Sequence, residues 1–159
     1  MKKYTLLFII LPILMFSTIS IKAQNLGFGF KVIPQLWGDP EGQMIRTKFI
    51  VNPDNDLAVE LRLGFNGDTT STNLAMGFYL SKGIILKEDF SLNGLGGIVY
   101  KNFWGNQFIL EAGAEFEYFF ADYFSVSAEA LLYFNVSNTM YGIGAHSFGT
   151  SVTYYIIQE

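Results

Sequence analysis

The sequence predicts an all-β protein: an eight-stranded antiparallel, up-and-down transmembrane β-barrel that follows an N-terminal signal peptide. Three observations predict this fold. Apolar and polar side chains alternate over long stretches, and the charges of each stretch fall on one face. Tight polar turns alternate with longer links along the chain. Half of the residues are hydrophobic, yet after the N-terminus no apolar run approaches the ~20 residues that a membrane-spanning helix needs.

Residues 1–23 predict a secretory signal peptide. The chain begins with Met-Lys-Lys, continues with the apolar run Leu6–Phe16, and reaches a small residue at Ala23. This run is shorter than a spanning helix, and its flanks are typical of a cleaved signal. We expect cleavage before Gln24, with residues 24–159 forming one outer-membrane barrel domain.

Charge and residue content exclude several function classes. Cleavage would remove three of the ten Lys and Arg residues, leaving seven against fourteen Asp and Glu, a formal charge of −7. Such a chain is not expected to bind nucleic acid, which requires clustered basic residues. The sequence has no Cys and one His, so neither a disulfide framework nor a His/Cys metal site is expected. We expect no cofactor.

The first five strands are predicted from an alternation of period two, because successive strand side chains point to opposite faces. They lie near 26–33, 44–51, 57–65, 73–81 and 90–100. Their apolar positions, in order, are Leu26, Phe28, Phe30 and Val32; Ile45, Phe49 and Val51; Leu57, Val59, Leu61, Leu63 and Phe65; Leu74, Met76, Phe78 and Leu80; Leu92 and Ile98. Periodicity does not decide whether 83–86 extends the fourth strand or forms a bulged turn.

The sixth and seventh strands form the clearest hairpin, with arms at 107–119 and 124–135 around the turn at 121–123. The glutamates of both arms share one face, and the large apolar side chains share the other. A strand needs ~9–11 residues to cross a bilayer, and arms of this length and polarity are typical of transmembrane barrels.

The eighth strand is predicted near 147–157, and the connections fit an even-stranded barrel. Tight turns at 53–56, 87–89 and 121–123 alternate with longer links at 34–43, 66–72, 101–106 and 136–146. Short periplasmic turns at one end and longer external loops at the other are the expected layout of an outer-membrane barrel.

Two segments carry a family resemblance. The hairpin segment EFEYFFADYFSVSAEALLYF joins an aromatic pair, a small polar turn and Ser-Val-x-Ala-Glu, and the last strand contains the pattern Ser147-x-Gly149-x-x-Val152-x-Tyr154. The chain resembles small outer-membrane β-barrel proteins such as the OmpA transmembrane domain and OmpX. The resemblance implies that the pattern of the last strand is an assembly signal read by the barrel-assembly machinery. That family usually ends on an aromatic residue, whereas this chain continues to Glu159.

The charged face is expected to line the lumen. It collects Lys31, Arg46, Lys48, Glu60, Arg62, Glu111, Glu115, Glu117 and Glu129. Basic residues occupy the first three strands and most of the glutamates the sixth and seventh, so we predict salt bridges across the lumen. Arg46, Lys48 and Arg62 are expected to reach the glutamates opposite, since an unpaired buried charge is heavily penalised. An eight-stranded barrel is just wide enough to be filled by such side chains, which leaves no diffusive pore.

Aromatic residues are expected at both membrane interfaces. Trp37 and Trp104 lie near the longer links, whereas Tyr118, Phe120 and Tyr123 lie around the turn of the clearest hairpin. Aromatic girdles of this kind flank the apolar band of transmembrane barrels.

Function is predicted less sharply than fold. The leading interpretation is a non-enzymatic outer-membrane protein with a structural or surface-interaction role, whose partners are outer-membrane lipid and an unknown ligand of its outer loops. One alternative is a lipid A-modifying enzyme built on His146 and Ser147, although adjacent strand residues point to opposite faces. Another is a periplasmic calycin-like carrier whose apolar face would turn inward around a ligand.

Overall fold

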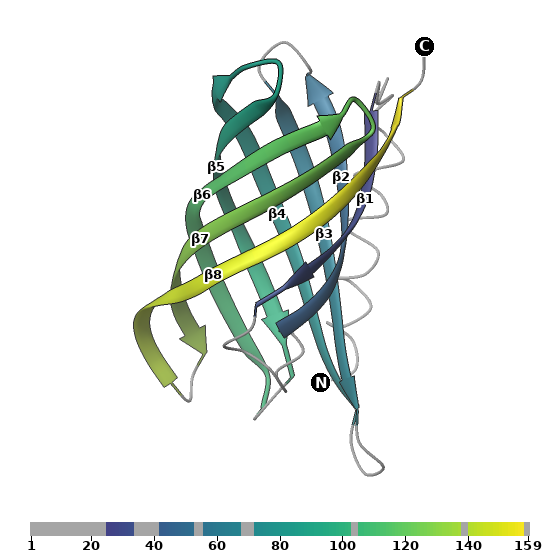
Figure 1. Ribbon diagram of the computed structural model, residues 1–159. Coiled ribbons are helices and arrows are strands. Elements are labelled where there is room, and N and C mark those ends of the chain that lie inside the picture. Colours follow the sequence, from purple (N-terminus) through teal and green to yellow (C-terminus); the bar gives the residue numbers. More distant parts are fainter. Residues whose placement is uncertain are drawn as a thin grey trace.

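The computed structural model describes residues 25–33, 42–52, 56–67, 72–102, 105–137 and 140–157, and these form one closed barrel of eight antiparallel strands (Figure 1). Each strand pairs with the next along the chain, and the last pairs with the first. The predicted eight-stranded antiparallel barrel is therefore confirmed. Residues 1–24, including the predicted signal peptide, lie outside the described part.

The strands follow the alternating segments of the sequence. They are β1 Asn25–Val32, β2 Gln43–Asn52, β3 Leu57–Gly67, β4 Thr72–Leu86, β5 Phe90–Lys101, β6 Gln107–Ala121, β7 Phe124–Ser137 and β8 Met140–Ile157. Below, the turn side is the end where β2 meets β3, β4 meets β5 and β6 meets β7. The loop side is the opposite end.

Two strands extend beyond the ranges given by their alternation, and for the fourth strand the sequence had left this question open. The fourth strand does not stop at 81: it continues to Leu86, with Ile84 as an extra residue between the pairs Gly83–Asn93 and Ile85–Leu92. This register shift preserves the pairing with β5, and it breaks the alternation on which the prediction depended.

The last strand was also predicted too short, because residues 136–146 were interpreted as a loop. In the structure β7 runs on to Ser137 and β8 begins at Met140. The register passes from Glu129–Gly149 to Leu131–His146, so positions 147 and 148 both lie opposite one residue of β7. This bulge changes the phase of the alternation, which explains why the Gly-rich segment was not recognised as a strand.

The strands are staggered around the barrel. Following paired residues from Leu26 through the successive strands leads to Ala145 of β8, whereas Leu26 itself pairs with Ile156. Such a stagger accompanies strands that tilt relative to the barrel axis, and the tilt is visible in Figure 1.

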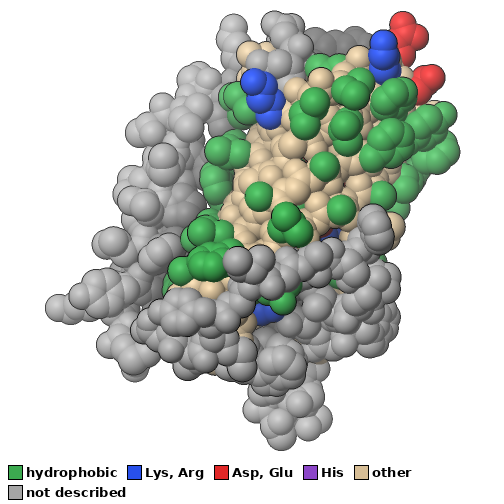
Figure 2. Space-filling model, turned by 90° about the vertical axis from the view of Figure 1, so that its left-hand side faces the viewer, with side chains coloured by type: hydrophobic (Ala, Val, Ile, Leu, Met, Phe, Trp, Pro, Cys, Tyr) green, Lys and Arg blue, Asp and Glu red, His purple; other side chains and the backbone are tan. Residues whose placement is uncertain are grey.

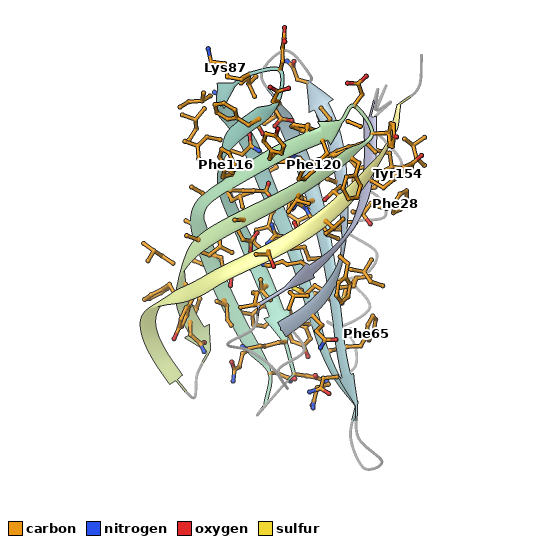
Figure 3. All side chains as sticks on the ribbon, viewed as in Figure 1. Phe28, Phe65, Lys87, Phe116, Phe120 and Tyr154 are labelled. Atoms are coloured by element: carbon orange, nitrogen blue, oxygen red, sulfur yellow. The ribbon has the colours of Figure 1, made fainter. Side chains whose placement is uncertain are left out.

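The two faces of the wall differ in chemistry. Large apolar side chains are exposed on the outside of every strand, and Phe28, Phe65 and Phe116 project from the wall in Figure 3. Charged strand residues are buried inside, with Lys82 as the exception among the described strands. The extension of β4 brings Lys82 onto the outer face, which the sequence had predicted to be free of charge.

Candidate functional site: the charged lumen

All nine charged residues predicted for the lumen are buried inside the barrel. None exposes more than 6% of its surface. They come from β1, β2, β3, β6 and β7, and we call them the lumen charge network. The members are Lys31, Arg46, Lys48, Glu60, Arg62, Glu111, Glu115, Glu117 and Glu129.

Arg46 is the centre of this network. Its guanidinium forms a bidentate salt bridge with Glu115 across the lumen: Nη2 donates to Oε2 at 2.9 Å, and Nη1 donates to Oε1. The same group donates to Glu60 at 2.7 Å and to the Ser151 hydroxyl at 2.8 Å. A planar guanidinium suits such paired contacts, which are among the stronger hydrogen bonds in proteins. Arg46 thus joins strands that lie far apart in the sequence.

Arg62 extends the network towards β7 and β1. It donates to Glu60 on its own strand at 2.9 Å and pairs with Glu129 across the lumen at 3.0 Å. Glu129 also pairs with Lys31. A Cβ at Gly149 would lie 3.1 Å from both of these side chains, so a glycine there gives the Lys31–Glu129 pair its room.

Lys48 is the cation at the turn-side end of the lumen charge network. Its ammonium lies 2.9 Å from Glu117 and 3.8 Å from Asp56. Asp56 sits in the turn before β3 with a φ of 46°, a left-handed conformation that Asp tolerates better than most residues. Burial raises the pKa of the Asp56 carboxyl above its ordinary value, and the nearby Lys48 opposes this change only in part.

Neutral hydroxyl groups complete the network, and the sequence interpretation missed them. Tyr79 donates to Glu111, Tyr155 to Glu117, and Ser127 to Glu115. All three residues occupy inward positions of their strands, on the face opposite the large exposed apolar residues. Extending the parity rule from charged to polar side chains would have identified them.

An apolar lumen cluster fills the other part of the interior. It consists of Tyr79, Leu95, Val99, Ile109 and Leu131. Tyr79 joins the two regions, because the Arg62 guanidinium lies 4.0 Å from the centre of its ring. A Cβ at Gly97 would lie 2.3 Å from that ring, so a glycine is required where β5 passes Tyr79.

The other predicted residues are only partly described. Tyr118, Phe120 and Tyr123 are exposed at the turn side, where Tyr118 packs edge-on against Phe120. Trp37 and Trp104 lie outside the described residues. Within the predicted assembly pattern, Gly149 is buried, and Val152 and Tyr154 are exposed on the outer face.

The His146–Ser147 pair falls at the bulge of β8, and its side chains lie outside what the structure describes. The backbone of His146 pairs with Leu131, and position 147 is one of the two that face Ala130. Among the described residues, no group of three or more His, Cys, Asp or Glu side chains is arranged to hold a metal ion. The lumen carboxylates that the structure describes are engaged with cations or hydroxyl groups, an arrangement suited to holding the walls together.

Comparison with protein-family models, curated proteins and solved structures finds no match for this chain. In the described part of the chain, no helix has the length and apolar character needed to cross a membrane.

Proposed function

We propose that this chain is a small integral outer-membrane β-barrel protein with a side-chain-filled lumen and a structural or surface-interaction role. One observation carries the proposal: the charged residues of the described strands, except Lys82, are buried inside the barrel, and every strand exposes large apolar residues on the outside. Exposed apolar side chains on every strand of a barrel mark a surface that contacts a membrane or another protein. A Lys or Arg at the bilayer midplane costs ~2–4 kcal/mol, so a membrane favours this segregation.

Closure of the sheet supports the same proposal. Backbone groups in a bilayer must be hydrogen-bonded within the protein, which a closed barrel achieves and an open sheet does not. The N-terminal segment 1–23 has the character of a signal for export across the inner membrane. The loop-side connections would then face outward and carry any interaction with a partner.

The filled lumen argues against the two other interpretations. A calycin-like carrier needs an apolar interior, whereas charged residues from six of the eight strands are buried in this one. The lumen glutamates are held by cations and hydroxyl groups, and no observation favours an enzyme. We therefore propose no catalytic activity.

Gel mobility of the protein from the outer-membrane fraction, with and without boiling in SDS, tests the proposal. A closed barrel has no free strand edge and is expected to stay folded in cold SDS and to shift on heating. A single unshifted band in the soluble periplasmic fraction would contradict the proposal.

A further inference from the structure

Lys82 is an unusual residue on the outer face of the barrel. Among the strand residues that the structure describes, it is the only exposed Lys, Arg, Asp or Glu. Its neighbours on the same face of β4 are Leu80, with 54% exposure, and Ile84, with 66%. Lys82 has no carboxylate partner among the described residues.

The position of Lys82 along the strand brings it near the turn-side interface of a bilayer. It precedes the strand end, Leu86, by four residues. At ~3.3 Å per residue and a tilt of ~35–45°, this places it roughly 10 Å from Leu86 along the barrel axis. The tip itself carries Lys87, Glu88 and Asp89, which are exposed. A lysine side chain extends its ammonium towards the headgroups from such a depth.

The Ile84 side chain lies beside Gly94, with its Cδ1 3.4 Å from where a Cβ at Gly94 would be. Beyond Ile84 the wall is a low area, in which the outward side chains are small and apolar. Lys82 lies directly opposite Gly94 of β5, and the next outward positions on β5, β6 and β7 are also small. The small outward residues are Gly94, Gly96, Ala112, Ala114, Ala128 and Ala130. Figure 2 shows an area of backbone and small side chains between groups of larger hydrophobic side chains.

Larger apolar side chains border this area. Leu80, Ile98 and Leu132 are exposed on its loop side, and Ile85 and Phe116 on its turn side. A Cβ at Gly96 would meet nothing within 4 Å, so the space above this residue is open.

We propose that Lys82 and this low area form a binding site for an anionic phospholipid of the turn-side leaflet. The ammonium would pair with the lipid phosphate, and an acyl chain would lie over Gly96 and Ala112. The inference rests on the proposed function, since it requires the barrel to span a bilayer. Charge complementarity selects this occupant: an apolar surface with a single cation matches a molecule with apolar chains and an anionic head.

The test measures the lipid selectivity of the full barrel in phosphatidylcholine vesicles. One set of vesicles contains a trace of spin-labelled phosphatidylglycerol, and the other a trace of spin-labelled phosphatidylcholine. The fraction of motionally restricted label measures contact with the protein. A lysine near the surface contributes enough attraction for about a fivefold preference for the anionic lipid. K82Q is expected to lose this preference, whereas K87Q, which removes an exposed lysine from the hairpin tip, is expected to retain it.

G96L provides a second variant, since it fills the open area without changing charge. It is expected to reduce the number of restricted anionic lipids while the barrel stays folded. A wild-type protein without preference, or a K82Q variant that keeps it, would overturn the lipid site. Heat-dependent gel mobility of the protein from the same vesicles distinguishes failure of the proposed function from failure of the lipid site. A chain that never inserts overturns both proposals. An inserted chain without lipid selectivity overturns the lipid site alone.

Discussion

The lumen charge network and the apolar lumen cluster occupy one barrel interior and meet at Tyr79, whose ring lies under Arg62. The network connects β1, β2 and β3 to β6 and β7 across the lumen by ion pairs. The cluster joins neighbouring strands β4 to β7 by packing. Ion pairs are directional and specify which strands face each other, whereas apolar contacts stabilise without selecting a unique partner.

This difference predicts how each region responds to substitution. Removing one member of a buried ion pair leaves its partner charged and unpaired, which costs more than the pair itself contributes. Removing apolar volume costs in proportion to the cavity that remains. The network should therefore be sensitive to single changes and tolerant of matched double changes, and the cluster should show no such compensation.

The largest effect is expected for Arg46→Leu. It leaves Glu60 and Glu115 buried without their shared cation. The unfolding free energy in phospholipid vesicles, measured by urea titration, should fall by about 3–5 kcal/mol. The double variant R46L/E115L should recover part of this loss, because both charges of the central pair are then gone. A double variant whose loss equals the sum of the two single losses would show that the pair is not coupled.

Leu131→Ala tests the cluster, and its neighbour supplies the control. Leu131 is buried inside the barrel, whereas Leu132 is 62% exposed on the outer face. L131A should lower the unfolding free energy by about 2–4 kcal/mol, and L132A should cost less because no internal cavity forms. Equal losses for the two variants would contradict the assignment of Leu131 to a packed interior.

Tyr79→Phe separates the two contributions that meet at this residue. The variant keeps the ring beneath Arg62 and removes the hydroxyl that donates to Glu111. A hydrogen bond to a charged group contributes about 1.5 kcal/mol or more, so a loss of that size is expected. Y155F, which removes the hydroxyl that donates to Glu117, should lose a similar amount. No loss in either variant would mean that the hydroxyl groups are incidental to the network.

The sequence predicted the network well because its physical basis is local. Strand parity alone places a charge inside or outside. The lumen residues of β2 and β6 follow parity because they precede the register shifts at Ile50–Asn52 and Phe119–Ala121. The cross-lumen partners of Arg46, Lys48 and Arg62 could be narrowed to the glutamates of β6 and β7 by the order of strands in a barrel.

The cluster and the strand ends could not be predicted in the same way. Leu95 and Val99 share the inward parity, but apolar residues on both faces of β5 hide the alternation. The bulges at Ile84 and at positions 147–148 change the phase, and a single sequence gives no signal for an extra residue until the pairing is known. The need for glycine at position 97 follows from the close approach of the Tyr79 ring, and this contact joins two different strands.

The smallest effect is expected at the turn-side end of the network, where Asp56 tests whether Lys48 needs a second carboxylate. Burial raises the pKa of Asp56 despite Lys48, so the folded barrel favours the protonated carboxyl. This group stabilises the folded state at low pH, and the stabilisation is lost as the pH rises through the raised pKa, from about pH 4 upward.

Asp56→Asn keeps the left-handed turn, which Asn also tolerates, and removes this titration. The unfolding free energy of D56N relative to wild type should therefore increase between pH 4 and pH 7, and urea titrations at the two pH values measure it. A relative stability that falls over the same range would mean that the Lys48–Asp56 contact at 3.8 Å outweighs burial. Lys48 would then depend on two carboxylates, and the network would extend beyond the strands into the turn.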